Sequence, residues 1–447
     1  MSSRRFPERV RGAWVAVALA AMCGVTACRD ASHEAPLDTR IAALDRPHIV
    51  LLVVDTLRAD WLEPYGFDQS TSPELQRWAD RGITFERALA QSSWTKVSMA
   101  SMLTSLWPRT HGVVAPTDGL GEGAVSVVEL LRDAGYATAA VQSNGWLEQS
   151  FGFQQGFDHY VFPRAEGAAR ELWISSIWPH GDRILEEARR LVDGRDPAKP
   201  LFLYLHFMDV HEYAAPPSLR TFGGDQKGFY LASIRWVDET LQRVHALLED
   251  RGMLENAVIV LASDHGETFG ENQSHGHAFN VYSSVLHVPL IFKLPFDVPA
   301  RRVSAQVRNL DIAPTLLDLA GVPVPDDFEG ESLVPLLSGA APAVDRPSFA
   351  SLPFDIMRTS TLQDAVNDGS WTFVRDIEEG GEEHLFDLEW DLAEDANLVE
   401  LEPEAAARMR AVLDAHLAAE PRPGVSRGNV RIDPAVAERL RAVGYLE

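Results

Sequence analysis

Residues 47–62 read PHIVLLVVDTLRADWL, and this stretch decides the fold. Its centre, residues 49–54, is an unbroken run of isoleucine, valine and leucine, which is typical of a strand buried on both faces of a parallel sheet. Other apolar runs occur at residues 137–141, 201–205, 258–261 and 288–292, and helical patterns lie at residues 125–134, 181–192 and 230–248. Strands that alternate with helices predict an α/β fold, in which helices cover both faces of a mostly parallel sheet.

The length, composition and charge of the chain limit the classes of protein to which it can belong. With 447 residues, of which 46% are hydrophobic, the chain is long enough for a large core and a main domain with a smaller one. Its formal net charge is -25. An acidic chain lacks the basic surface that binding to a nucleic acid requires, so we expect no nucleic-acid partner.

The first 28 residues have the pattern of an export signal. A basic segment, an apolar run over residues 13–22 and small residues follow one another in the required order. The string Val25-Thr26-Ala27-Cys28 resembles the lipobox of bacterial lipoproteins, whose cysteine is acylated and becomes the mature N-terminus. This resemblance implies a lipid anchor at Cys28 and a place in the cell envelope, either periplasmic or surface-exposed. An ordinary signal peptide, or an uncleaved anchor, is the alternative.

In the rest of the chain, the composition and the apolar pattern change twice. Residues 29–46 are polar, without sustained apolar periodicity, and are expected to form a linker. Residues 47–340 contain the strands and helices of the main domain. After them, prolines break the chain, and a strand at residues 371–375 and helices at residues 402–418 and 434–443 follow. We expect residues 341–447 to form a smaller C-terminal subdomain packed on the main domain.

Acidic and imidazole side chains follow three of the apolar runs. Asp55 follows residues 49–54, Asp209 and His211 follow residues 201–207, and Asp264 and His265 follow residues 258–263. Because the carboxyl ends of parallel strands meet at one edge of a sheet, these side chains are expected to lie close together. Each one alone could be a turn or cap residue. Together they indicate a site for a divalent metal ion, namely Mg, Mn, Zn or Ca, and the imidazole argues against Ca.

Two further histidines follow in the string His275-Gly276-His277. They add imidazoles to the same region of the chain, and a pair of surface histidines without a role is the alternative.

Several segments resemble the sulfatase family within the alkaline-phosphatase superfamily. The resemblance rests on RPHIVLLVVDTLRADWL (46–62), SSWTKVSMASMLTSLWPRTHGV (92–113), LASDHGETFGENQSHGHAFNVYSSVLHVPLIF (261–292), NLDIAPTLLDLAGVPVPDDFEGESLVPLL (309–337), HLFDLEWDLAEDANL (384–398) and ERLRAVGYLE (438–447). These segments occur in the family's order, and the resemblance spans nearly all of residues 47–447. The resemblance implies a three-layer alkaline-phosphatase-like fold and a metal-dependent hydrolase of sulfate or phosphate esters that acts outside the cytoplasm.

The resemblance also assigns roles to single residues. It places metal ligands at Asp55, Asp264 and His265, and the nucleophile at Thr95, counted back from Leu103 and Thr104. Groups that contact the ester oxyanion or protonate the leaving group are implied at His211 and at His275 or His277.

The sequence departs from the family at five places. The usual cysteine, which becomes formylglycine, is Thr95, and the proline and arginine of that motif are Val97 and Met99. The second aspartate of the first segment is Thr56, and the string GYATAAVQSNGWL (135–147) has Ser143 and Asn144 where a lysine is usual. The formylglycine mechanism therefore cannot be transferred to this chain.

A threonine can nevertheless serve as a nucleophile. Metal coordination through its hydroxyl oxygen would favour the alkoxide, so we expect Thr95 to be a metal ligand as well. Apolar residues at helical spacing after Thr95 predict a helix that begins there, and a helix N-terminus attracts an anionic ester. A plain helix cap without a catalytic role is the alternative for Thr95.

Three functions remain open on these grounds. The first is a hydrolase that acts on a sulfated or phosphorylated glycan or lipid. The second is an envelope transferase for phosphoryl-linked groups, such as phosphoglycerol or phosphoethanolamine, because threonine nucleophiles resemble those of the superfamily's phosphodiesterases and phosphoglycerol transferases. The third is a surface-binding protein that keeps the fold without turnover, motivated by Met99 and the missing lysine.

Overall fold

The computed structural model describes residues 35–163, 181–342, 344–357, 359–378, 380–420, 425 and 427–430. The chain forms two compact units, Met1–Pro36 and Leu37–Glu447, and the second contains all the elements given below. The export signal with Cys28, the start of the predicted linker, the predicted helix at residues 434–443 and the C-terminal string at residues 438–447 lie outside the described residues. Among the described helices, none combines the length and the apolar character needed to cross a bilayer.

The main sheet has eight strands, in the order β11-β2-β10-β7-β1-β6-β4-β5. Its strands are β1 (His48–Val54), β2 (Ile83–Leu89), β4 (Ala137–Gln142), β5 (His159–Val161), β6 (Leu201–Phe207), β7 (Ala257–Ala262), β10 (His287–Lys293) and β11 (Arg301–Arg308). Strand β1 lies at the centre and pairs in parallel with both β6 and β7. Only β10 runs antiparallel to its neighbours β7 and β2, so the prediction of a mostly parallel sheet is confirmed.

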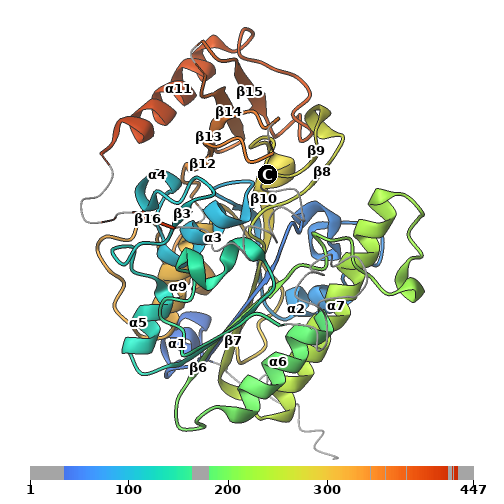
Figure 1. Ribbon diagram of the computed structural model, residues 1–447, viewed down its shortest axis with the longest axis vertical. Helices are drawn as coiled ribbons and strands as arrows, with labels where there is room; N and C mark the ends of the chain where they lie inside the picture. The colour runs from blue at the N-terminus through green and yellow to red at the C-terminus, as the bar shows by residue number, and fades with distance from the viewer. Residues whose placement is uncertain are drawn as a thin grey trace, which may run out of the picture. The chain divides into compact units, whose positions relative to one another are not determined.

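Helices cover both faces of this sheet (Figure 1). On one face, Val50, Leu52 and Val54 of β1 belong to a core shared with helices α2 (Pro73–Asp80), α6 (Gly181–Gly194) and α7 (Gln226–Asp250). On the other face, Ile49, Leu51 and Val53 belong to a core shared with α3 (Thr95–Thr104), α5 (Val127–Asp133) and α9 (Ile312–Leu319). Successive residues of a strand point to opposite faces, so an unbroken apolar run fills both cores. The predicted three layers are present.

Short elements connect these layers. They are α1 (Leu37–Ala42), α4 (Pro108–His111), α8 (Ser283–Leu286), α10 (Val334–Ser338), β3 (Asp118–Gly119), β8 (Thr268–Phe269), β9 (His275–Gly276), β16 (Gly428–Asn429) and the 3-10 turns η1 (Ala59–Trp61), η2 (Glu63–Tyr65), η3 (Gly145–Leu147), η4 (Gln149–Phe151), η5 (Pro217–Leu219), η6 (Leu254–Asn256), η7 (Glu271–Gln273) and η8 (Asn309–Asp311). Helix α1 differs from the predicted linker over residues 29–46, because Ile41 is buried in the main core. Leu37, the first residue of the helix, packs against the same core, so apolar contacts anchor the helix to the domain.

A second sheet forms the C-terminal subdomain. It has four antiparallel strands, β12 (Ser348–Leu352), β13 (Gln363–Asp368), β14 (Trp371–Asp376) and β15 (Glu383–Asp387), and helix α11 (Pro403–Ala418) packs on it through a core of its own. The predicted strand at residues 371–375 and helix at residues 402–418 are thereby confirmed. The amide of Ser351 donates to the carbonyl oxygen of Gln91, which ties β12 to the main domain.

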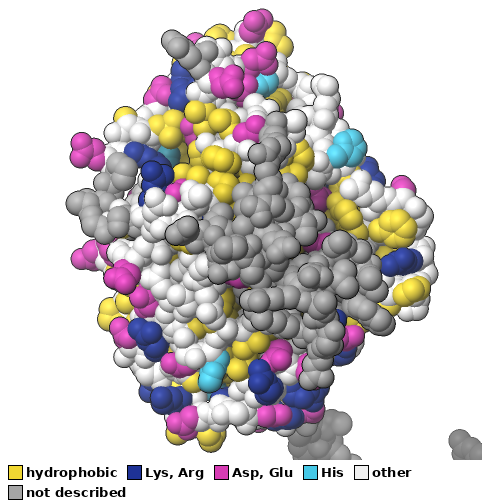
Figure 2. Space-filling view, viewed as in Figure 1, with side chains coloured by type: hydrophobic (Ala, Val, Ile, Leu, Met, Phe, Trp, Pro, Cys, Tyr) yellow, Lys and Arg dark blue, Asp and Glu magenta, His cyan; other side chains and the backbone are white. Residues whose placement is uncertain are grey.

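Charged side chains are distributed over the surface. Figure 2 shows lysine and arginine interspersed with aspartate and glutamate around the described part of this face. Many are paired across elements, such as Arg302 with Glu86 and Arg410 with Glu383. Exposed pairs of this kind contribute little to stability individually, so the hydrophobic cores account for most of the folding free energy.

Candidate active site

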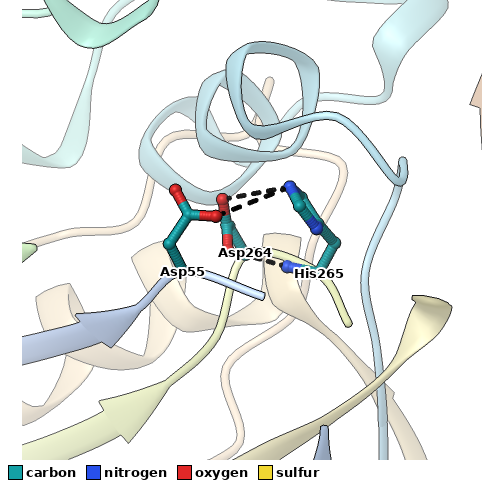
Figure 3. Close-up of side chains that lie close together, drawn as sticks. All are labelled: Asp55, Asp264 and His265. Atoms are coloured by element: carbon teal, nitrogen blue, oxygen red, sulfur yellow. Dashed lines mark hydrogen bonds and ion pairs between the residues drawn. The ribbon is translucent and has the colours of Figure 1, made fainter. Parts of the chain in front are cut away.

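Four side chains of distant sequence position meet at the carboxyl edge of the main sheet. Asp55 directly follows β1, and Asp264 and His265 follow the adjacent parallel strand β7, while Thr95 is the first residue of α3. Because β1 and β7 are parallel neighbours, the residues after them leave the sheet side by side. Asp55, Asp264 and His265 are fully buried and point toward one another (Figure 3).

The distances within this cluster are short. The Thr95 hydroxyl oxygen lies 3.1 Å from His265 Nε2 and 3.4 Å from Asp55 Oδ2. His265 Nε2 lies 3.5 Å from Asp264 Oδ2 and 3.9 Å from Asp55 Oδ1. One ligand atom each from Asp55, Asp264 and His265 can be chosen so that all lie within 4.8 Å of one another, a spacing that one metal ion can bridge. The structure thus brings together the four residues that the sequence predicted as metal ligands.

Not every carboxylate oxygen of the cluster receives a hydrogen bond from a described residue, so some oxygens remain available to bind a cation. Within the part of the chain that the structure describes, Asp55 Oδ1 and Asp264 Oδ2 are buried and receive no hydrogen bond. Buried carboxylate oxygens almost always have partners, because stripping them of water is costly. Burial and the neighbouring Asp55 carboxylate raise the pKa of Asp264, as expected for two acids that share one pocket. A divalent ion between them would remove this repulsion.

The imidazole of His265 has a suitable orientation for a ligand. Its Nδ1 lies 3.0 Å from the carbonyl oxygen of Gly266, which can only accept a hydrogen bond. The proton therefore belongs on Nδ1, and the lone pair of Nε2 faces Thr95 and the carboxylates. Two carboxylates, one imidazole and one hydroxyl are a donor set that suits Mg, Mn or Zn. These residues fit a divalent metal ion.

Thr56 shapes the turn that delivers Asp55. Its φ is 59°, which is rare for a β-branched residue and marks a conformation imposed by its surroundings. The backbone N–H of Thr56 donates to Asp264 Oδ1 over 3.3 Å, and its hydroxyl donates to the carbonyl oxygen of Asp55. The hydroxyl of Tyr230, a residue of α7, donates a hydrogen bond to the carbonyl oxygen of Thr56. At the position of the family's second aspartate, Thr56 thus supports the cluster through its backbone.

Two residues that the sequence did not single out as ligands or catalysts contact Asp55. Asn144 Nδ2 lies 2.7 Å from Asp55 Oδ2, and His206 Nε2 lies 3.1 Å from the same oxygen. Asn144 follows β4 by two residues, and His206 lies near the end of β6. The strand-end rule counted carboxylates and imidazoles that follow a strand, so it passed over the amide of Asn144 and over His206, which lies inside β6.

The predicted histidines divide between two places. His277 lies beside the cluster, with its ring centroid 4.8 Å from that of His265 and 4.8 Å from that of His211. Burial lowers the pKa of His277, and its Nδ1 lies 3.3 Å from Glu267 Oε1. His275 is exposed on the β8–β9 hairpin, and the structure does not bring it to the cluster. Of the predicted pair, His277 is the one placed to act at the site.

Asp209 has a different place from the other strand-end aspartates. Its Oδ1 accepts hydrogen bonds from the backbone N–H of Gly181 and from Trp236 Nε1, at 3.1 and 2.9 Å. It therefore links the start of α6 to α7, which is the structural role that a lone aspartate after a strand often has.

The basic residue next to Thr95 points away from the cluster. Lys96 Nζ donates to the carbonyl oxygen of Pro116 over 2.8 Å and lies 3.7 Å from the centre of the Phe151 ring. Val97 and Met99 belong to the main core. The side chains that follow Thr95 on α3 therefore hold the helix in place, and the polar contacts of Thr95 come from other elements.

Comparisons with known proteins match long parts of this chain. A family model described as Sulfatase matches residues 47–322, and one described as N-sulphoglucosamine sulphohydrolase, C-terminal, matches residues 270–420. The N-acetylglucosamine-6-O-sulfatase of Bacteroides thetaiotaomicron is 24% identical over 67% of this chain and 72% of its own length.

Solved structures show the same fold. One, in complex with its substrate D-glucosamine-2-N,6-O-disulfate, has a TM-score of 0.70 at 19% identity and covers 83% of this chain and 97% of its own. The phosphonate monoester hydrolase of Agrobacterium radiobacter has a TM-score of 0.68 at 20% identity and covers 87% of this chain and 98% of its own. These matches confirm the predicted three-layer alkaline-phosphatase-like fold with a C-terminal subdomain.

Proposed function

We propose that this chain, which belongs to the sulfatase family, is a metal-dependent hydrolase of sulfate esters with Thr95 as its nucleophile. One observation carries the proposal. The Thr95 hydroxyl lies within 3.4 Å of both Asp55 and His265, in a cluster where two carboxylate oxygens have no hydrogen-bond partner among the described residues. A hydroxyl beside a cation site is the arrangement that activates a weak nucleophile.

Four side chains of the chain would hold the metal ion, and a helix N-terminus would bind the anionic ester. Asp55, Asp264, His265 and Thr95 would hold the metal ion, which, when bound, supplies positive charge that lowers the pKa of the hydroxyl and offsets charge on the ester. The N-terminus of α3, where Thr95 lies, presents free backbone N–H groups to an anionic group.

The reaction would proceed in two displacements. Thr95, after loss of its hydroxyl proton to solvent, attacks sulfur, and the new Oγ1–S bond forms as the bond from sulfur to the ester oxygen breaks. The leaving oxygen takes a proton from His277 or His211, whose rings lie 4.8 Å apart beside the cluster. Water then attacks sulfur as the Oγ1–S bond breaks. One proton of this water goes to Thr95, the other returns to the histidine, and sulfate departs.

A sulfated glycan is the substrate class that we propose. The relative from Bacteroides thetaiotaomicron is named for a sulfated amino sugar, and one similar structure holds a disulfated glucosamine. A sulfated lipid would present the same ester to the site, so a panel of glycan and lipid sulfates distinguishes the two.

Phosphoryl chemistry is the second candidate, and the residue at position 95 favours it. A formylglycine hydrate can expel sulfate without attack of water on sulfur, whereas a threonine ester lacks that route. The same site would then hydrolyse a phosphoester, or pass a phosphoryl-linked group to an envelope acceptor. Product with an alcohol acceptor, and little free phosphate, would identify the transferase.

We also propose that the protein is anchored by lipid at Cys28 in the cell envelope, with residues 47–340 as catalytic domain and residues 341–447 as C-terminal subdomain. The lipobox string supports the anchor. Incorporation of a labelled fatty acid by the wild type, and its loss in Cys28→Ser, is the expected result. Labelling of the variant would contradict the anchor.

Thr95→Ala tests the proposed function. We expect the variant to lose at least about 10³-fold in kcat/KM, because the nucleophile is missing, and to keep metal-dependent thermal stabilisation through the three other ligands. The measurement is turnover of nitrophenyl sulfate, phosphate monoester and phosphodiester, with Mg, Mn, Zn and Ca varied. Thr372→Ala, which removes a buried threonine of the subdomain, is the matched control and should keep its activity.

The result also separates the remaining alternatives. Undiminished turnover in Thr95→Ala would remove Thr95 from the mechanism. A wild-type protein that binds no metal and turns over no ester would favour the non-catalytic surface-binding protein.

A further inference from the structure

Asp55 Oδ2 receives hydrogen bonds from Thr95 and from two further side chains. Asn144 Nδ2 donates to it over 2.7 Å and His206 Nε2 over 3.1 Å. Both donors therefore fix the carboxylate so that its other oxygen, Oδ1, is left without a partner among the described residues. Of these two residues, only Asn144 also contacts the proposed nucleophile. Its Nδ2 lies 3.3 Å from the Thr95 hydroxyl oxygen.

The amide of Asn144 cannot turn around. Its Oδ1 accepts a hydrogen bond from the backbone N–H of Trp146 over 2.8 Å, which caps the turn η3. A carbonyl oxygen is required at that position, so the NH₂ group must face Asp55 and Thr95. The ring of Trp146 is buried and packs edge-on against Trp94, the residue before Thr95, with ring centroids 5.2 Å apart. The amide and the hydroxyl are thereby held by one rigid unit.

The NH₂ group of Asn144 has two acceptors here, because Nδ2 lies within hydrogen-bond distance of both Asp55 Oδ2 and the oxygen of Thr95. The Thr95 hydroxyl in turn has two acceptors within reach, Asp55 Oδ2 at 3.4 Å and the unprotonated Nε2 of His265 at 3.1 Å. This arrangement orients the oxygen that attacks, and the N–H of Asn144 strengthens as a donor when negative charge develops on that oxygen.

We infer that Asn144 is a catalytic residue that stabilises the attacking oxygen of Thr95, an inference that rests on the proposed function. His206 has a different role. Its Nε2 donates to Asp55, so its Nδ1 accepts the hydrogen bond from Tyr204 Oη at 2.6 Å. This buried chain reaches Asp55 without touching Thr95, so His206 is a positioning residue for the metal ligand.

Substitutions of the two donors separate these roles. In Asn144→Ala we expect kcat at saturating Mn²⁺ to fall by about 10²- to 10³-fold, with KM changed by less than about threefold. Loss of its hydrogen bond to Asp55 should also raise the dissociation constant for Mn²⁺ by about 10- to 100-fold. In His206→Phe we expect the dissociation constant for Mn²⁺ to rise by about 10- to 100-fold, with kcat largely restored at saturating Mn²⁺. Kinetics and calorimetric titration with Mn²⁺ are the two measurements.

Two more variants guard against a loss of folding. Asn144→Ser keeps an oxygen that accepts from Trp146 at the start of the turn but lacks the NH₂ group, and it places no third carboxylate beside Asp55, so it should fold and show the same loss of kcat. Asn367→Ala removes another buried amide, which donates to Thr372 Oγ1 over 2.7 Å in the C-terminal subdomain. It should keep the wild-type kcat, which shows that losing such a bond does not by itself lower turnover.

Two results would overturn the inference. The first is a kcat within about twofold of wild type in both Asn144 variants while Thr95→Ala is inactive. The second is a loss in Asn144→Ala that saturating Mn²⁺ restores, since Asn144 would then only position Asp55. Full activity in Thr95→Ala would instead reject the proposed function itself.

Discussion

The carboxyl edge of the main sheet and the C-terminal sheet both bury polar side chains, but they complete their hydrogen bonds differently. In the C-terminal sheet, Asn367 donates to Thr372 over 2.7 Å and Gln363 donates to Asp376 over 2.9 Å. At the edge of the main sheet, one oxygen of Asp55 and one of Asp264 receive no hydrogen bond among the described residues.

This difference separates polar groups that serve the fold from those that serve a ligand. A satisfied pair in the C-terminal sheet adds to stability and needs nothing more. Two facing carboxylates with unfilled oxygens cost stability until a cation binds, and such groups concentrate at functional sites. The strained backbone of Thr56, with φ at 59°, lies at the same edge.

The largest expected effect comes from removing one of the facing carboxylates. Asp264→Asn should lose metal binding and at least about 10³-fold in kcat/KM, because the ligand charge is gone. The metal-free variant should be as stable as the metal-free wild type or more so, because the repulsion with Asp55 that raises the pKa of Asp264 has been removed. Metal titration and thermal unfolding without metal check both parts. A metal-free variant of much lower stability would show that Asp264 is structural.

Removing the metal from the wild type should have a smaller effect. A ligand that binds only the folded state at a hundred times its dissociation constant stabilises by about 2.7 kcal/mol, so a chelator should lower the unfolding temperature by a few degrees. Asp264→Asn should show no such shift. An equal shift in both proteins would place the metal elsewhere.

The smallest expected effect lies in the C-terminal sheet. Asn367→Ala should lower the free energy of unfolding by about 1 to 3 kcal/mol, because Thr372 Oγ1 loses its donor in a buried place. Denaturant titration gives the free energy, and nitrophenyl sulfate turnover should match that of the wild type. A loss of turnover in the folded variant would mean that this sheet contributes to the site.

The sequence predicts the parts of the fold whose pattern is strong. Strands β1, β6 and β7 are apolar on both faces, and a helix with a regular apolar stripe, such as α6, is equally visible. The apolar pattern does not predict strands β2 and β11, because β2 contains Glu86 and Arg87 and β11 begins with Arg301 and Arg302. Their place at the side of the sheet next to the C-terminal subdomain lets polar residues pair across strands.

The sequence likewise predicts only some of the residues of the site. Asp55, Asp264 and His265 could be found from strand ends and charge, and Thr95 from the family resemblance. Asn144 could not, since a neutral amide is common in turns and its role depends on which atoms it faces. Nor could the sequence choose between His275 and His277, because a hairpin turn with Gly276 at φ 96° directs the two to different surroundings.

Diffraction from crystals soaked in Mn²⁺, with anomalous scattering recorded, tests the cation site most directly. We expect one strong peak at about 2.2 Å from Asp55 Oδ1, Asp264 Oδ2 and His265 Nε2, with the oxygen of Thr95 completing the set. An empty cluster at saturating Mn²⁺, or a peak bound by other residues, would contradict the account.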